Sequence, residues 1–216
     1  MTKAKRTLAA AIALSAAITC SIAAAPPAGA ASCEGTYTIA VGGLNDGAST
    51  IFSGGVDQRV GYSAQLSSAS AREGVNELNR LIRNQRAACP NQHAKVVGFS
   101  EGAAVAHIWV SENWPTFDDV NAVLISDPKR RGGPGADGLA GQFYAAVMGA
   151  PLYGSDRHFG DIPTVSICTD DVICDSAAPS GWIGYLTGAH GNYSFNVDDY
   201  SDDGHGQWFN GVFMSW

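Results

Sequence analysis

A Gly-x-Ser-x-Gly pattern at Gly98–Gly102 constrains the fold of this chain more than any other feature. It follows the β-branched run Lys95–Val97, which suits a buried strand. Small residues at Ala103–Ala106 come after it and allow a helix to pack closely on a sheet. Between a strand and a helix, this pattern indicates a nucleophile elbow. The turn leaves no room for flanking side chains, and the serine hydroxyl projects from strained backbone. Because the pattern also arises by chance, its meaning depends on the rest of the chain.

The N-terminus has the features of a secretory signal peptide. Three basic residues open the chain: Lys3, Lys5 and Arg6. The apolar, alanine-rich stretch Leu8–Ala25 follows, and Ala28–Ala30 offers small residues for cleavage. We therefore predict a signal peptide at residues 1–30, one mature domain at residues 31–216, and a secreted, extracellular protein. No later stretch is long and apolar enough to span a bilayer, so we expect no transmembrane segment.

Charge limits the partners of the mature chain. Removal of the leader takes away three positive charges and changes the formal net charge from −7 to −10. Such an acidic protein would repel phosphates, so we expect no nucleic-acid partner. The remaining 186 residues suit a single domain with a sizeable core. We expect a monomer.

Four cysteines remain after Cys20 leaves with the signal peptide. In an exported chain they are expected to form two disulfides. Three pairings are open from the sequence; Cys168 and Cys174 are close enough to close a small local loop, which leaves Cys33 with Cys89. We expect no metal site, because no Cys-x-x-Cys pair or histidine cluster accompanies the cysteines.

Strands and helices are predicted to alternate along the chain. Helices are expected from Ser67 or Ser68 to about Gln85, from the elbow to about Val110, and over a short stretch at 141–148. Strands are expected at Thr36–Val41, Lys95–Gly98, Val120–Ile125 and Pro163–Cys168. This alternation predicts an α/β fold, with a central, mostly parallel sheet covered by helices on both faces. Sites in such sheets form at the carboxyl ends of the strands.

A reactive serine needs a histidine to accept its proton and a carboxylate to orient that histidine. In this fold class the chain order is serine, acid, histidine. Asp171 is the favoured acid, because the loop between Cys168 and Cys174 would hold it in place. Its neighbour Asp170 is a second option. Asp127, just past the end of the strand at Val120–Ile125, is the main alternative.

Chain order also narrows the choice of histidine. It excludes His93, and it excludes His158 if Asp171 is the acid. His107 lies on the helix behind the elbow and is expected to face away. His190 is favoured, because it follows an apolar loop at 177–186 that is suited to line a substrate mouth. His205 lies in an acidic stretch and is interpreted as a solvated loop residue.

Two backbone N–H groups are expected to stabilise the oxyanion of the transition state. One belongs to Glu101, the residue after the serine, and the other lies near Leu44, in the glycine-rich loop after the first strand. The charge of Glu101 suits a helix N-terminus. An anion beside an oxyanion hole would weaken catalysis unless the side chain turns outward.

Over nearly the whole mature length, the chain resembles the cutinase family of small secreted serine esterases, particularly actinobacterial cutinase-like proteins and the related PE-PPE-type hydrolase domains. Four features carry the resemblance. They are Cys89-Pro90 ahead of the serine, the run Gly98–Ala103, the pattern Asp171–Cys174, and His190 followed by Tyr193. The run Val123–Pro128, followed by Gly132-Gly133, is similar to the PE-PPE-type group.

The resemblance implies a lidless α/β-hydrolase fold, the disulfides Cys33–Cys89 and Cys168–Cys174, and the catalytic residues Ser100, Asp171 and His190. It also implies ester hydrolysis through an acyl-enzyme without a cofactor. Three features depart from the family pattern. Glu101 replaces the usual glutamine, Leu44 replaces a usual serine or threonine, and the cysteine loop is one residue shorter than in fungal cutinases.

These observations predict a secreted serine carboxylesterase that acts on short- to medium-chain acyl esters, in small-molecule or polymeric form. One alternative is a polysaccharide deacetylase of the acetylxylan-esterase kind. Another is a secreted or cell-surface interaction protein on a hydrolase scaffold that has lost activity, an alternative that Glu101 and Leu44 suggest.

Overall fold

The computed structural model describes residues 33–143, 145, 154–176 and 179–216. The predicted signal peptide at 1–30 lies outside the described residues. The short helix predicted at 141–148 lies only partly within them. Its described neighbourhood holds the 3-10 helix η1, Leu139–Gly141.

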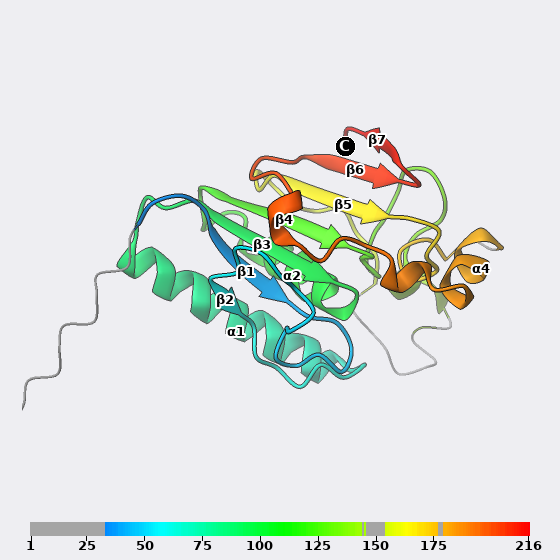
Figure 1. The fold of residues 1–216 in the computed structure, drawn as a ribbon, viewed down its shortest axis with the longest axis horizontal. Coiled ribbons are helices and arrows are strands. Elements are labelled where there is room, and N and C mark those ends of the chain that lie inside the picture. The colour runs from blue at the N-terminus through cyan, green and yellow to red at the C-terminus, as the bar shows by residue number, and fades with distance from the viewer. Residues whose placement is uncertain (1–32, 144, 146–153, 177–178) are drawn as a thin grey trace, which may run out of the picture. The chain divides into compact units, whose positions relative to one another are not determined.

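The described residues form one seven-stranded sheet in the order β2-β1-β3-β4-β5-β6-β7 (Figure 1). All neighbouring pairs are parallel except β6 with β7, which is antiparallel. The arrangement confirms the predicted α/β class. The strands are β1 (Tyr37–Val41), β2 (Gln58–Arg59), β3 (Ala94–Phe99), β4 (Val120–Ile125), β5 (Thr164–Cys168), β6 (Gly206–Phe209) and β7 (Val212–Met214).

The central strands are buried on both faces, and successive side chains enter different cores. Along β1, Ile39 and Val41 join one apolar cluster, whereas Ala40 joins the other. The same alternation separates Val96 from Val97 on β3. It follows from the two-residue period of a strand, and it explains why these segments read as continuous apolar runs.

Helices α1 (Ser68–Ala88) and α2 (Glu101–Asn113) cover one face. The Ser67 side chain caps α1 by accepting a hydrogen bond from the Ser70 N–H. Helix α2 lies against β3 and β4 and is buried continuously from Glu101 to Val110 (Figure 1). Its small residues allow this close approach to the sheet, as the sequence predicted.

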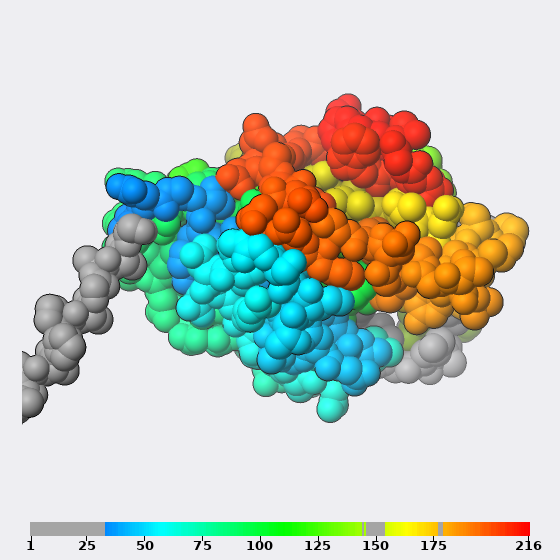
Figure 2. All heavy atoms as spheres, viewed as in Figure 1, coloured from blue at the N-terminus to red at the C-terminus, as the bar shows by residue number. Residues whose placement is uncertain are grey.

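Two irregular segments cover part of the opposite face. Phe52 and Val197 are buried in its apolar cluster, and Phe195 packs against them. The segments are joined where the Ser53 N–H donates to the Phe195 carbonyl, at 2.8 Å. Atoms coloured cyan and orange therefore lie over the sheet in Figure 2. The 3-10 helix η3 (Val197–Asp199) belongs to this cover.

The structure differs from the sequence prediction in one helix and three strands. The segment expected to be an apolar loop contains helix α4 (Ser180–Leu186), and strands β2, β6 and β7 were not predicted. These strands are only two to four residues long, too short for a clear apolar period. Asn210 and Gly211, both at positive φ, join β6 to β7. Such an Asn-Gly pair is a hairpin signal that the sequence did contain.

The structure contains the disulfides Cys33–Cys89 and Cys168–Cys174, the pairing favoured by the sequence. The first joins the segment before β1 to the end of α1. The second closes a short loop at the carboxyl end of β5, next to the predicted catalytic acid.

Candidate active site

Ser100 occupies a sharp turn between β3 and α2, with φ 56° and ψ −119°. Non-glycine residues rarely adopt positive φ, so this backbone is strained. The two flanking glycines are required by close backbone contacts. A Cβ on Gly98 would lie 2.4 Å from the Gly102 carbonyl oxygen, and one on Gly102 would lie 2.1 Å from that of Val41. The predicted elbow geometry is therefore present.

The loop after β1 lies directly against the elbow. A Cβ on Gly43 would come within 3.1 Å of both the Phe99 carbonyl oxygen and the Ser100 Cβ. Among the described residues, the backbone N–H groups of Leu44 and Glu101 have no hydrogen-bond partner. Both residues line the same cavity as Ser100. Two free donors beside a serine can stabilise an oxyanion.

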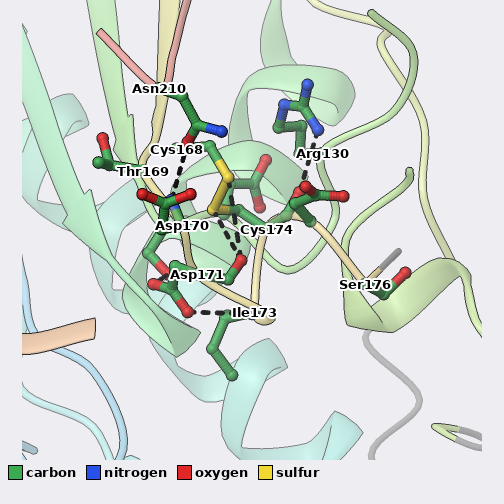
Figure 3. Close-up of a disulfide and its surroundings, with 12 residues drawn as sticks. Arg130, Cys168, Thr169, Asp170, Asp171, Ile173, Cys174, Ser176 and Asn210 are labelled. Atoms are coloured by element: carbon green, nitrogen blue, oxygen red, sulfur yellow. Dashed lines mark hydrogen bonds between the residues drawn. A yellow bond between two sulfur atoms is a disulfide. The ribbon is translucent and has the colours of Figure 1, made fainter. Parts of the chain in front are cut away.

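Asp171 is fully buried in the loop that the Cys168–Cys174 disulfide closes (Figure 3). One of its carboxylate oxygens, Oδ1, accepts the Ile173 N–H at 3.1 Å. The neighbouring Asp170 is exposed, and its N–H donates to the Asn210 side chain at 2.8 Å. Of the two aspartates, only Asp171 contacts a histidine: His190 Nδ1 lies 2.7 Å from Asp171 Oδ2.

The His190 ring is held between two aromatic side chains. Its centroid lies 4.8 Å from that of Phe99 and 5.3 Å from that of Tyr185. His190 belongs to the 3-10 helix η2 (Ala189–Gly191), which Gly188 precedes in the left-handed region at φ 95°. The two aromatic neighbours and the bond to Asp171 restrict the ring, and its other nitrogen, Nε2, makes no hydrogen bond to the described residues.

Two further hydroxyl groups donate to Asp171 Oδ2. The sequence analysis did not predict these contacts. Ser126 Oγ donates to this oxygen at 2.5 Å, and the Tyr193 hydroxyl donates to it at 3.1 Å. Ser126 directly follows β4, at the same sheet edge as Ser100. That position was the only sequence signal for it.

These contacts keep Asp171 ionised and Tyr193 neutral. Burial opposes ionisation of Asp171, but the hydrogen bond and charge of His190, with the Ser126 hydroxyl, lower the pKa of Asp171 below its usual value. Burial, together with the charge of Asp171, raises the pKa of Tyr193. Tyr193 can therefore serve as a donor to the carboxylate.

Asp127, the alternative acid, points to a different histidine. Its Oδ2 lies 2.6 Å from His107 Nδ1, and His107 Nε2 lies 2.8 Å from Asp156 Oδ1. His107 is fully buried on α2. Burial alone would lower the pKa of His107, but the two neighbouring carboxylates outweigh it, so the pKa of His107 is raised and its protonated form is favoured. The cluster is a buried ion pair behind the elbow rather than part of the cavity.

The remaining histidines lie away from the serine. His93 and His205 directly precede β3 and β6, so they lie at the amino ends of parallel strands, opposite the edge that carries Ser100. His158 is exposed and accepts a hydrogen bond from Trp114 Nε1 at 3.0 Å. Only His190 shares a cavity with Ser100 among the described residues.

The Glu101 side chain does not turn outward. The sequence analysis had made an outward orientation the condition under which its charge would not weaken catalysis. It is only 2% exposed, and neither carboxyl oxygen has a hydrogen-bond partner of good geometry among the described residues. Burial raises the pKa of Glu101 to about 7, an effect that the nearby Ser70 side chain partly offsets. At mildly acidic pH this carboxyl is therefore neutral.

A cavity of about 380 Å³ opens beside Ser100 and His190. Its volume lies within the usual range of small-molecule sites, about 300–1,000 Å³. The lining is largely apolar, and it includes side chains of α4, which the sequence placed in a loop. Its apolar members include Leu44, Leu66, Leu139, Ala140, Ile173 and Trp182.

The described residues contain no group of three or more His, Cys, Asp or Glu side chains that could hold a metal ion. Within the same ranges, no helix has the length and apolar character needed to cross a membrane.

Comparison with known proteins places these features in a family. The family model for cutinases matches residues 28–202. A protein of Kineococcus radiotolerans described as a cutinase is 30% identical over 145 residues, which are 63% of this chain. The match covers 43% of that protein, so the chain spans less than half the length of this curated relative.

Two solved structures match most of the chain. A cutinase-like protein from Cryptococcus sp. is 19% identical, with a TM-score of 0.50; the match covers 74% of this chain and 91% of that one. An acetyl xylan esterase is 15% identical, with a TM-score of 0.47, and the match covers 73% and 95% of the two chains. The first of these likenesses supports the α/β-hydrolase fold.

Mutation should distinguish the roles of the two buried aspartates, Asp127 after β4 and Asp171 after β5. Asp171→Asn removes the charge that orients His190, so kcat is expected to fall about 10³- to 10⁴-fold with little loss of folding. Asp127→Asn leaves His107 with one carboxylate fewer. It should lower the free energy of unfolding by a few kcal/mol while the folded protein keeps its kcat. Steady-state kinetics and urea unfolding measure both; the reverse pattern would make Asp127 the catalytic acid.

The buried carboxyl of Glu101 predicts a pH-dependent cost to stability. Because its pKa is raised from 4.5 to about 7, the unfolded chain ionises first, and stability should fall as pH rises through this window. Glu101→Gln should therefore be more stable than wild type at pH 8, by on the order of 2–3 kcal/mol, and similar to it at pH 4. Urea unfolding at both pH values measures this. The exposed Glu34→Gln is the control, and equal gains at both pH values would contradict the explanation.

Proposed function

The chain belongs to the cutinase family, and we propose on this premise that it is a secreted serine carboxylesterase acting on short- to medium-chain acyl esters. The observation that carries the proposal is the shared cavity: Ser100 and His190 both line it, and Asp171 holds the His190 ring from behind at 2.7 Å. Three residues from different loops thus have the relationship that a nucleophile, its base and the orienting acid require.

Catalysis would begin with attack of Ser100 Oγ on the ester carbonyl carbon. His190 Nε2 accepts the serine proton, because Nδ1–H is engaged by Asp171. The carbonyl oxygen becomes an oxyanion and accepts hydrogen bonds from the N–H groups of Glu101 and Leu44. Collapse of this intermediate breaks the bond to the alkoxy oxygen, which leaves as the alcohol with the proton from His190. Water then attacks the acyl-enzyme by the same route, and the acid is released.

The departures from the family pattern act on the oxyanion step. Leu44 supplies no hydroxyl, so stabilisation of the oxyanion rests on the two backbone N–H groups. The Glu101 side chain adds no charge beside the oxyanion while it is protonated. Its pKa, raised to about 7, favours this neutral form below about pH 7. The machinery is therefore suited to an active enzyme rather than to an inert scaffold.

The cavity favours an apolar acyl group. Its walls include Leu66, Ile173 and Trp182, and a polysaccharide would find few hydrogen-bond partners along them. Leu44, Leu66 and Trp182 are each more than 40% exposed, so apolar surface continues from the wall to the mouth. This arrangement suits acyl esters in solution and ester groups of an apolar polymer.

The two disulfides support an exported protein, because such bonds persist in oxidising compartments. Cleavage of the predicted signal peptide after about residue 30 and a monomeric state are part of the proposal. So is catalysis without a cofactor.

Chain-length profiling tests this function. The mature protein should hydrolyse p-nitrophenyl esters from acetate to laurate with the highest kcat/KM among the short and medium chains, because the cavity has a volume of only about 380 Å³. Ser100→Ala should lower kcat by roughly four to six orders of magnitude without changing the fold. Circular dichroism provides the folding control.

Three results would contradict the proposal. They are an inactive wild type, a Ser100→Ala variant as fast as wild type, and activity confined to acetylated xylan. The last would favour the deacetylase alternative. An inactive wild type that also fails to react with a fluorophosphonate would favour an interaction protein.

A further inference from the structure

We propose that Ser126 is a positioning residue that holds the Asp171–His190 pair in its working geometry through its side-chain hydroxyl. This inference rests on the proposed function, since it assigns a role within the same site. It concerns a residue that neither the Gly-x-Ser-x-Gly pattern nor the chain order of the three proposed catalytic residues would identify.

The backbone at Ser126 is the first argument. It is fully buried, and its φ of 52° lies in the left-handed region, where glycine is the favoured residue. A serine there carries a steric cost that glycine would avoid. The hydrogen bonds that the serine side chain makes would compensate for that cost.

The hydroxyl closes a triangle with the two proposed catalytic groups. Ser126 Oγ donates to Asp171 Oδ2 at 2.5 Å and lies 3.2 Å from His190 Nδ1. The third side is the 2.7 Å contact between His190 Nδ1 and Asp171 Oδ2. The His190 Nδ1–H thus has two acceptors within reach, Asp171 Oδ2 and Ser126 Oγ. These contacts limit rotation of the ring and keep the proton on Nδ1.

The backbone at this position also joins the three strands of the site. The Ser100 N–H donates to the Ile125 carbonyl at 2.9 Å, and the Ser126 N–H donates to the Ile167 carbonyl at 2.8 Å. Ser126 therefore sits between the strand that carries the nucleophile and the strand that leads to the acid. Through its hydroxyl, Ser126 holds the side chains of Asp171 and His190 in a fixed position relative to these strands.

The hydroxyl has an electrostatic consequence as well. It shares the negative charge on Asp171 Oδ2, the same oxygen that faces the histidine. Without it, the carboxylate would hold the protonated imidazole more strongly. Activity falls at low pH where His190, the proposed base, is protonated. Without the Ser126 hydroxyl, this acidic limb of the pH–rate profile would move to higher pH.

Two variants separate the hydroxyl from the backbone strain. Ser126→Gly removes both, whereas Ser126→Ala removes the hydroxyl and keeps the strain. We expect Ser126→Gly to retain a Tm close to wild type and Ser126→Ala to have a lower one. Both should lose kcat by about 10- to 100-fold with KM within about twofold, and both should show the shifted acidic limb.

The measurements are p-nitrophenyl butyrate kinetics from pH 5 to 9, thermal unfolding, and the low-field proton NMR signal of the His190 Nδ1–H. The signal should move and broaden in both variants. Ser166→Ala is the matched control, because Ser166 is 1% exposed on β5 and its hydroxyl has no partner among the described residues. It should match wild type in all three.

A Ser126→Gly variant with the kcat, acidic limb and NMR signal of wild type would overturn the inference. Failure of the proposed function is a separate result: an inactive wild type would refute the esterase, while the NMR comparison, which needs no substrate, would still decide whether Ser126 controls His190.

Discussion

The close approach of three backbone segments around Ser100 is the constraint on which the rest of this structure depends. Helix α2 starts so near β1 and β3 that neither Gly98 nor Gly102 has space for a Cβ. Gly43 brings the loop after β1 against Ser100 in the same way. One steric condition thus sets the serine in its strained turn and brings two unpartnered N–H groups beside it. The same condition requires the small residues of α2, because a bulkier helix could not approach the sheet.

The end of β4 carries two neighbouring side chains that contact different histidines. Ser126 and Asp127 are adjacent, yet the first contacts Asp171 and His190 while the second contacts His107. The carboxylates of Asp127 and Asp171 are both fully buried, and each contacts a histidine. They differ in surroundings: His107 is enclosed and held between two acids, whereas His190 has one ring nitrogen directed away from its acid and lines the cavity. Only the second arrangement can exchange a proton with a substrate.

Most of the central fold was predictable from local sequence, because β1, β3, β4 and β5 are rich in apolar and β-branched residues and a serine caps α1. The short strands β2, β6 and β7 and helix α4 were missed, since their identity depends on the neighbours they pair with or pack on. Chain order and the cysteine loop were enough to favour Asp171 and His190. They could not reveal that the Glu101 side chain is buried, that Ser126 contacts Asp171, or that α4 lines the cavity. Those facts depend on contacts between residues far apart in sequence.

Covalent labelling of the serine tests the central claim most directly. The mature protein would be treated with a fluorophosphonate, and the modified residue would be identified by peptide mass spectrometry. We expect a single adduct on Ser100, formed rapidly in wild type and far more slowly in Asp171→Asn, because an unoriented His190 activates the serine poorly. Absence of the adduct, an adduct on another serine, or equal labelling rates in the two proteins would contradict it.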